Sequence, residues 1–221
     1  MQAFTTPAPI HVILDIPAGR VEFIAADRAD TTVEVRPADP GKGRDVKAAE
    51  QATVTYKDGV VWINAAAPHN QLLGASGSLD VSVQLPAGSR VEARTASTEL
   101  HGVGRLGDVA YEGAYRQIKI EEAASLHLTA VDGDVEVGRL SGPARITTAR
   151  GDINVAEAVR GTVELRTASG SITVGVAAGV SAALEAATTH GRVSNALKND
   201  GTIELEIHAT TSNGDITARS L

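Results

Sequence analysis

The second half of the chain alternates apolar and polar residues in short arms that meet at a glycine. Leu126 and Leu128 precede Gly133 at odd offsets. Val135 and Val137 follow it at even offsets. Alternation with a period of two is typical of a β-strand with one face buried. Because a regular strand cannot change its parity, the glycine must mark a bulge or corner that absorbs an extra residue. The pattern therefore predicts pairs of short strands joined at a glycine corner.

This unit recurs along the chain with spacings of 18 to 23 residues. A period of about 20 residues is typical of a solenoid, in which each rung stacks on its neighbour and cannot bury its apolar face alone. A Thr or Ala also stands three residues before each glycine, and stacked threonine hydroxyls are expected to bond the corner backbone between rungs. The expected structural corner glycines are Gly133, Gly151, Gly170, Gly191 and Gly214.

Weaker copies of the unit extend toward the N-terminus. Glu99–Gly102 and Gln117–Ile120 fit the template, with implied corners at Thr98 and Arg116. Together with the glycine copies they predict about seven rungs from residue 95 onward. The resulting fold class is all-β: a single-chain β-solenoid, β-helix-like, of stacked rungs of about 18–23 residues with an irregular N-terminal capping region.

The first third of the chain shows the same strand alternation without the regular spacing. We expect residues 1–90 to form an irregular capping half with an inserted hairpin, and residues 91–221 to form the regular solenoid repeats. Asp58-Gly59 is a strong hairpin signal between two β-rich arms, and 65–78 is the expected loop. The strands expected in this half are 10–16, 20–25, 31–36, 53–57, 60–64 and 79–85, with one short helical turn at 45–51.

The run Leu85-Pro86-Ala87-Gly88-Ser89, followed by the Gly-Asp-Ile, Gly-Asp-Val and Gly-Ser-Ile rungs, resembles the bacterial putative-adhesin family of unknown function with β-strand repeats. The resemblance covers nearly the whole chain. It implies a β-solenoid fold. It implies no catalytic residues that carry over to positions of this chain.

Composition narrows the classes of function. The net charge is −7 and no basic cluster appears, so phosphate-driven binding of nucleic acid is not expected. The chain has no cysteine, which leaves no disulfide framework and no thiolate nucleophile or ligand. We find neither a signal-peptide pattern at the N-terminus nor a long apolar run, and so expect a cytoplasmic protein without membrane insertion, at the surface only if exported by another route.

Two short patterns at the corners have a functional and a structural interpretation. Arg150-Gly151-Asp152 matches the tripeptide that integrins recognise, but it also occupies the corner of its rung, and the structural interpretation is favoured. Asp134 and Asp152 share one repeat position on adjacent rungs, about 4.8 Å apart. Such a ladder would either attract Ca²⁺ or accept backbone N–H bonds at the turn.

The histidines show no zinc-site spacing, and no nucleophile or phosphate-binding motif is present, so we expect no enzyme activity and no cofactor or metal. The favoured function is a non-enzymatic scaffold or protein- or peptide-interaction module. The alternative is a surface adhesin or carbohydrate-binding module, and a polysaccharide-active enzyme ranks last. A homo-oligomer is expected through the C-terminal edge of the solenoid, at Asp215, Ile216 and Thr217, because the last rung runs to the terminus without a cover.

Overall fold

The computed structural model describes residues 1–65, 77–114 and 117–221. The chain divides into two compact units, Met1–Arg116 and Gln117–Leu221. Both are β-solenoid-like, and the spacing of the repeat predicts this for the second unit. The expected corner at Arg116 and most of the expected loop at 65–78 lie outside the described residues.

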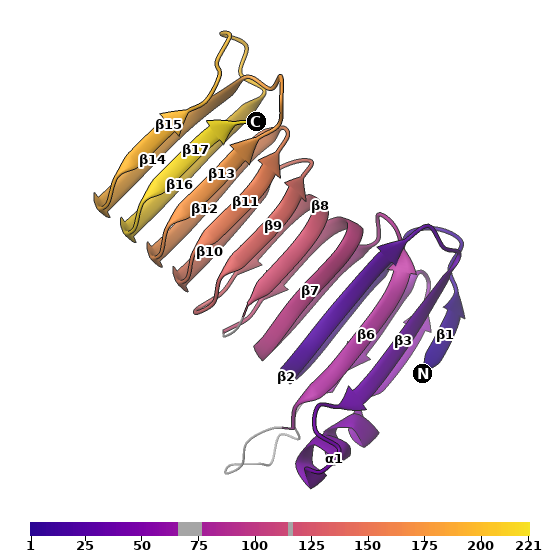
Figure 1. Ribbon diagram of the computed structural model, residues 1–221. Coiled ribbons are helices and arrows are strands. Elements are labelled where there is room, and N and C mark those ends of the chain that lie inside the picture. Colours follow the sequence, from indigo (N-terminus) through magenta and orange to yellow (C-terminus); the bar gives the residue numbers. More distant parts are fainter. Residues whose placement is uncertain (66–76, 115–116) are drawn as a thin grey trace. The chain divides into compact units, whose positions relative to one another are not determined.

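The C-terminal unit consists of rungs in which two strands meet at a corner (Figure 1). Its strands are β8 (Ile118–Thr129), β9 (Val135–Leu140), β10 (Ala144–Arg150), β11 (Ile153–Ala158), β12 (Gly161–Ser169), β13 (Ile172–Val176), β14 (Ala182–His190), β15 (Val193–Ala196), β16 (Leu205–Asn213) and β17 (Ile216–Ser220). All pairings between these strands are parallel.

The strands form two parallel sheets, one on each side of the core. One sheet has the order β8, β10, β12, β16, β14. The other has the order β8, β9, β11, β13, β17, β15. Strand β8 contributes to both, because its first half pairs with β9 and its second half with β10.

The register between rungs is the one that alignment on the glycines predicts. Ile146 pairs with Leu165 before the corner, and Ile153 pairs with Ile172 after it. All four side chains are fully buried. The change of parity at the corner is thereby confirmed, since both arms direct their apolar residues to the same core.

The order of the last two rungs differs from the order of the sequence. The C-terminal rung, β16–β17, lies between the β12–β13 rung and the β14–β15 rung (Figure 1). Residues facing the core explain this exchange. Ala218 of β17 is 1% exposed, whereas Asn195, its partner in β15, is exposed at the end of the unit. Burying the amide of Asn195 without hydrogen bonds would cost free energy, so the more apolar rung occupies the inner place.

The N-terminal unit is built around one long bent strand. Its elements are β1 (Gln2–Thr5), β2 (His11–Ala26), β3 (Asp30–Pro37), α1 (Gly43–Gln51), β4 (Thr53–Lys57), β5 (Val60–Asn64), β6 (Leu79–Pro86) and β7 (Arg90–Glu112). Strand β7 pairs in parallel with β2 from His11 to Ala25, on both sides of the bend. This pairing ties residues beyond 90 to the N-terminal half, so the division between the units falls after Arg116 and not near residue 90.

The bend of β2 lies at Gly19, which pairs with Thr98 of β7. Gly19 has a positive φ of 134°, and the two strands expected at 10–16 and 20–25 form one continuous strand with a corner at this residue. Its pairing partner, Thr98, is the position at which the repeat template places the corner of the next rung.

Antiparallel strands form one end of this unit. The hairpin β4–β5 forms as its Asp-Gly turn predicts, and Asp58 has the positive φ of such a turn. Strand β1, which the pattern did not predict, pairs with β3. The rings of Phe4 and Tyr56 meet with centroids 5.2 Å apart and so join β1 to the hairpin.

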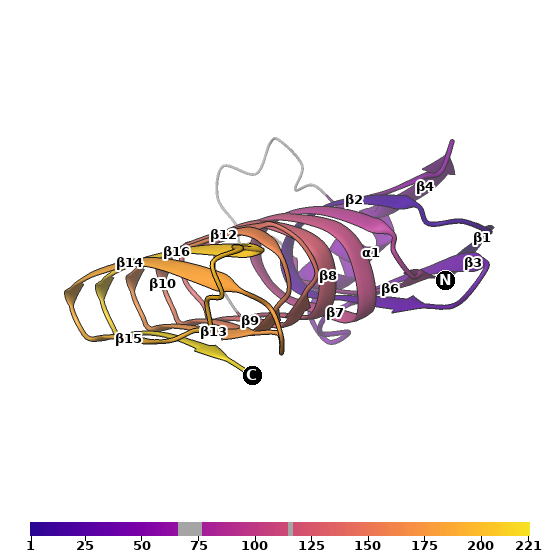
Figure 2. The ribbon, with the colours of Figure 1, turned by 90° about the horizontal axis from the view of Figure 1, so that it is seen from above.

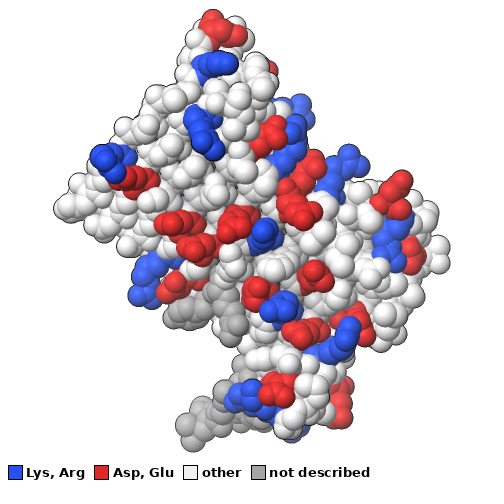
Figure 3. Space-filling view, viewed as in Figure 1, with Lys and Arg blue, Asp and Glu red and all other residues white. Residues whose placement is uncertain are grey.

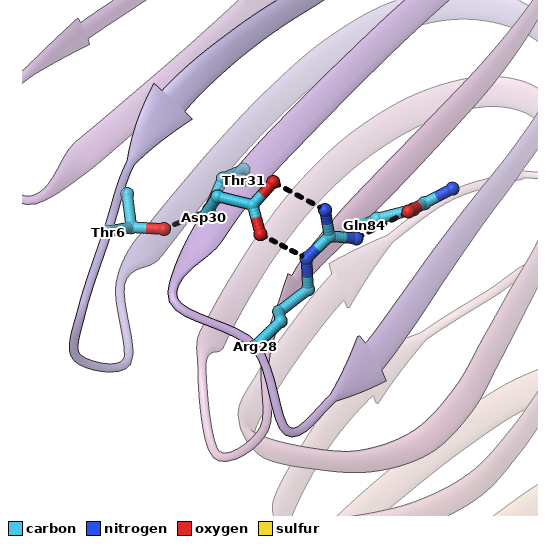
Figure 4. A network of polar contacts seen from close by, with 5 residues as sticks. All are labelled: Thr6, Arg28, Asp30, Thr31 and Gln84. Carbon is cyan, nitrogen blue, oxygen red and sulfur yellow. Dashed lines mark hydrogen bonds and ion pairs between the residues drawn. The ribbon is translucent and has the colours of Figure 1, made fainter.

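A polar network fastens the turn between β2 and β3. The guanidinium of Arg28 donates to both carboxylate oxygens of Asp30, at 3.0 and 2.7 Å, and also to Gln84 of β6 (Figure 4). Hydrogen bonding to Arg28 holds the pKa of the Asp30 carboxyl below its ordinary value. The hydroxyls of Thr6 and Thr31 bond each other in the buried layer beneath, 2.8 Å apart.

Candidate functional site

Each rung of the C-terminal unit is attached to the next by its corner glycine. Gly151 has a φ of 130°, and a Cβ placed on it would lie 2.2 Å from the carbonyl oxygen of Gly133. No side chain fits that gap. The same approach recurs from Gly170 to Gly151 (2.0 Å), from Gly214 to Gly170 (2.1 Å) and from Gly191 to Gly214 (1.9 Å).

Threonines that stand three residues before the corner glycines bind across the rungs. Three of these hydroxyls donate to the corner carbonyl of the adjacent rung, which supplies a partner to a backbone group that the bend leaves out of the strand ladder. The hydroxyl of Thr148 instead donates to the carbonyl of Arg150 in its own rung. The bonds join Thr167 to Gly151 (3.1 Å), Thr211 to Gly170 (2.9 Å) and Thr188 to Gly214 (2.9 Å). The expected hydroxyl bonding between rungs is confirmed.

The position after each corner glycine carries a second polar ladder. Oδ1 of Asp134 accepts the backbone N–H of Asp152 at 2.8 Å, and Oδ1 of Asp152 accepts that of Ser171 at 2.7 Å. The hydroxyl of Ser171 then accepts the N–H of Asp215 at 3.3 Å, and Asp215 accepts the N–H of Arg192 at 2.9 Å. The ladder follows the spatial order of the rungs, with Asp215 before Arg192.

These bonds decide what the aspartates do. Asp134 and Asp152 accept backbone N–H groups, as the turn interpretation of the ladder predicts. Among the described residues, no group of three or more His, Asp or Glu is placed to hold a metal ion. The same ladder lines a groove of about 230 Å³, together with Glu136, Asn154 and Thr173.

Asp215 contacts Arg192 of the outermost rung in two ways. The backbone N–H of Arg192 and then the Arg192 guanidinium, 3.0 Å away, hold the pKa of the Asp215 carboxyl below its ordinary value. This interaction joins the outermost rung to the one inside it.

The Arg-Gly-Asp tripeptide is tied into the same corner. Arg150 forms an ion pair with Asp132, 2.9 Å away, and Asp152 binds the backbone of Ser171. Both charged groups therefore make contacts within the fold, which agrees with the structural interpretation of this motif.

The open end of the C-terminal unit is the β14–β15 rung (Figure 2). Within the described part of the chain, β14 pairs only with β16 and β15 pairs only with β17. The core-facing position after the corner is 0% exposed at Ile172, 1% at Ile216 and 48% at Val193. The apolar core is thus covered up to β17 and uncovered at β15.

This arrangement corrects the predicted edge. Ile216 and Thr217 pair on one side with Ile172 and Thr173, and on the other with Val193 and Ser194. Asp215 binds both neighbouring rungs. The expected edge at Asp215, Ile216 and Thr217 is therefore wrong, because these residues lie inside the sheet. Asn195 was the signal in the sequence, since a polar residue at a core position is tolerated best at an end.

An aromatic side chain marks the outer face of the N-terminal unit. Trp62, the single tryptophan of the chain, is 37% exposed on β5. In the sheet it stands between Ile13 of β2 and Thr55 of β4. Aromatic residues make up 3% of the chain, and the outward direction of Trp62 is evident only in the folded unit.

A polar hollow of about 510 Å³ lies beside α1 in the same unit. Its charged groups pair with one another: Arg20 with Glu99 at 3.4 Å, and Lys42 with Asp39 at 3.0 Å. The carboxylate of Asp45 is buried and accepts the N–H of Ser78 at 3.0 Å. The lining of the hollow contains four acidic side chains and three basic ones.

Surface charge gives no single-sign patch on the face shown in Figure 3, where acidic and basic side chains alternate. Many of them form ion pairs between rungs, such as Arg145 with Glu164 at 3.0 Å. None of the helices formed by the described residues is long and apolar enough to cross a membrane.

The chain is similar to known proteins in sequence and in structure. A sequence model described as Toastrack DUF4097 matches residues 11–220. No curated protein matches the chain in sequence. A putative cell adhesion protein from Clostridium sporogenes is similar in structure, with 9% identity, coverage of 100% of this chain and 98% of that one, and a TM-score of 0.40. A putative adhesin from Bacteroides fragilis shows 10% identity, coverage of 98% and 95%, and a TM-score of 0.46.

Proposed function

The chain belongs to the Toastrack DUF4097 family, and on this premise we propose that it is a non-enzymatic interaction module that binds a strand of another polypeptide along its β14–β15 end rung. The observation that carries the proposal is the pairing of β14 and β15 on one side only, within the described residues. An unpaired strand edge presents a row of N–H and C=O groups to which an extended peptide adds.

The end rung lacks the features that protect natural edges. Strand edges are commonly guarded by proline, by outward lysines or by charges that point inward. Neither strand contains proline or lysine. Its charged side chains are turned back onto the inner rung: Glu185 lies 2.9 Å from His208, and Arg192 lies 3.0 Å from Asp215. The edge is thus open to pairing.

The corner ladder supports a structural role for the outward carboxylates. Asp134 and Asp152 use a carboxylate oxygen to hold the next rung, so these groups maintain the stacking of the scaffold. A scaffold with rigid stacked rungs presents its terminal edge in one fixed geometry, which lowers the ordering cost of binding.

Selection from a displayed random-peptide library against the purified full chain tests this function. We expect selected peptides to be rich in β-formers. Val193→Lys should abolish their binding, because it puts a charge at the uncovered end of the core. Asn154→Lys adds the same charge to the exposed outward face of β11 and should leave binding unchanged. Equal binding to both variants would contradict the proposal.

A carbohydrate-binding role is the second candidate, and Trp62 favours it. An exposed indole on a flat sheet offers an apolar face for stacking and a polar N–H. Because Trp62 is the single tryptophan, its fluorescence reports directly on this face. Soluble oligosaccharides should change the emission of the wild-type chain and show binding that Trp62→Ala removes and Trp62→Phe retains. No change across a panel of neutral and acidic oligosaccharides would eliminate this candidate.

The compartment in which the chain meets its partner is proposed separately. We expect the cytoplasm, and fractionation of native cells, with detection of the chain in the cytosolic, envelope and medium fractions, distinguishes this from a surface location.

A further inference from the structure

We propose that the β14–β15 end rung pairs with the same rung of a second copy of this chain, through a two-fold axis that joins β14 to β14 and β15 to β15. The inference rests on the proposed function, because both use the same open edge, and it specifies the partner.

The shape of the β14–β15 end favours a second rung over a single peptide as the binding partner. The unpaired edges lie on two sheets, β14 in one and β15 in the other, and Val193 is half-exposed where the core ends between them. A single extended peptide would pair with one edge and leave the other edge and the core open. A partner that consists of two strand edges with core residues between them covers all three at once.

A second copy supplies such a partner. In a two-fold dimer the same patch is used on both subunits. In the N-terminal unit β1 and β4 also pair on one side only, but a ring contact between Phe4 and Tyr56 joins these two strands. Among the described contacts, no ring contact joins β14 to β15, so we place the self-pairing at the β14–β15 end.

The sequence of β14 is compatible with antiparallel pairing to its own copy. With the axis at Ala187, Glu185 stands opposite Thr189 of the partner copy, so no like charges face each other. In the same register Ala186 stands opposite Thr188. Because both are core-facing positions, the core-facing residues of the two copies lie on the same side of the joined sheet. A register shifted by one residue would turn core positions outward.

Figure 2 shows nothing beyond β14 and β15 at this end of the C-terminal unit. The connection from Ala196 to Leu205 folds back onto the unit, where Ala182 donates to the carbonyl of Lys198 at 3.0 Å and Asp200 donates to the hydroxyl of Ser181 at 3.1 Å. Because Ala182 is the first residue of β14, this connection covers the start of the edge, and the part left for a second rung runs from 184 to 190.

Sedimentation equilibrium of the full chain is the first test. We expect a reversible monomer–dimer equilibrium. Val193→Lys should weaken it at least about tenfold, which corresponds to about 1.4 kcal/mol, because two lysines would be buried in the joined core. Asn154→Lys carries the same added charge on the outward face and should dimerise like the wild-type chain.

Disulfide trapping is the second test and reports directly on the position of the two-fold axis. The chain has no cysteine, so a single introduced thiol forms a disulfide only between copies. Ala187→Cys, at the proposed axis, should cross-link rapidly on oxidation. Thr210→Cys is the matched control, because Thr210 is the exposed partner of Ala187 one rung inside the edge, and it should stay uncross-linked.

A chain that is monomeric at all concentrations, or that cross-links equally through both cysteines, would overturn the second copy as partner. Such a chain that still selects peptides sensitive to Val193→Lys keeps the proposed strand-binding function. A dimer that Val193→Lys leaves intact overturns the use of this edge for self-association.

Discussion

At the corner of each rung, a side chain of any size would occupy the same space as the carbonyl oxygen of the adjacent rung. Gly151 combines this close approach with a positive φ, whereas Gly179 has a positive φ of 84° and no atom within 4 Å of its Cβ position. The two glycines therefore separate the effect of backbone strain from the effect of crowding.

We predict that Gly151→Ala destabilises the chain more than Gly179→Ala. The strain of a left-handed conformation costs about 1–2 kcal/mol at either site. At Gly151, the added Cβ must also displace the backbone of Gly133. This displacement would separate the two rungs. Chemical denaturation of both variants measures the difference. Equal losses of unfolding free energy would mean that the rungs absorb a methyl group at the corner without cost.

The carboxyl of Asp215 makes part of the stability depend on pH. Its pKa in the folded chain lies below the ordinary value of 3.8. Ionised Asp215 therefore adds stability above that pH, and the contribution is lost as the pH falls through the folded-state pKa.

We predict that Asp215→Asn lowers the melting temperature most at neutral pH, and that the gap from wild type narrows as the pH falls below 3.8. Arg192→Ala should keep most of this pH dependence, because the backbone N–H of residue 192 makes the larger contribution. A gap between wild type and Asp215→Asn that is constant with pH would refute the assigned role of the carboxylate.

At the scale of the strands, the exchange of the last two rungs is the main feature of the C-terminal unit. Each rung is a strand–corner–strand element with the same register, so any rung can stack on any other. β16 and β17 have neighbours on both sides, and β14 and β15 on one.

Hydrogen exchange tests this order in the unmodified chain, at a concentration low enough to keep it monomeric. We predict that amides of Leu205–Asn213 exchange more slowly than amides of Ala182–His190, since strands inside a sheet open with a higher free energy than strands at its end. Faster exchange in the C-terminal strand would place it at the edge instead.

For the whole molecule, the polar ladders imply a chain that folds without calcium. The carboxylates of Asp134 and Asp152 already accept backbone N–H groups, so a cation would have to replace those bonds. We predict that millimolar Ca²⁺ or a chelator shifts the melting temperature by no more than about 1 °C, because a ligand stabilises a fold only by binding it. A large rise with Ca²⁺, lost in the Asp134→Asn, Asp152→Asn double variant, would show a cation site.

Local pattern was sufficient to predict the rungs, their register and their corners. The alternation around Gly133 or Gly151 depends on nearby residues alone: which side chains face the core is settled by the period of two, and where the parity changes is settled by the glycine. The pairings of Ile146 with Leu165 and of Ile153 with Ile172 follow from this pattern.

The order of the rungs and the surfaces they leave open were decided by tertiary structure. Because every rung shares one register, the sequence is compatible with more than one stacking order, and the choice depends on which order buries the more apolar residues. Because Asn195 occupies a core position, the order that places β14–β15 at the end is favoured. The exposure of Trp62 depends in the same way on distant strands, since its neighbours Ile13 and Thr55 come from β2 and β4. Contacts between residues far apart in the chain, which no local pattern encodes, therefore determine the candidate binding surfaces.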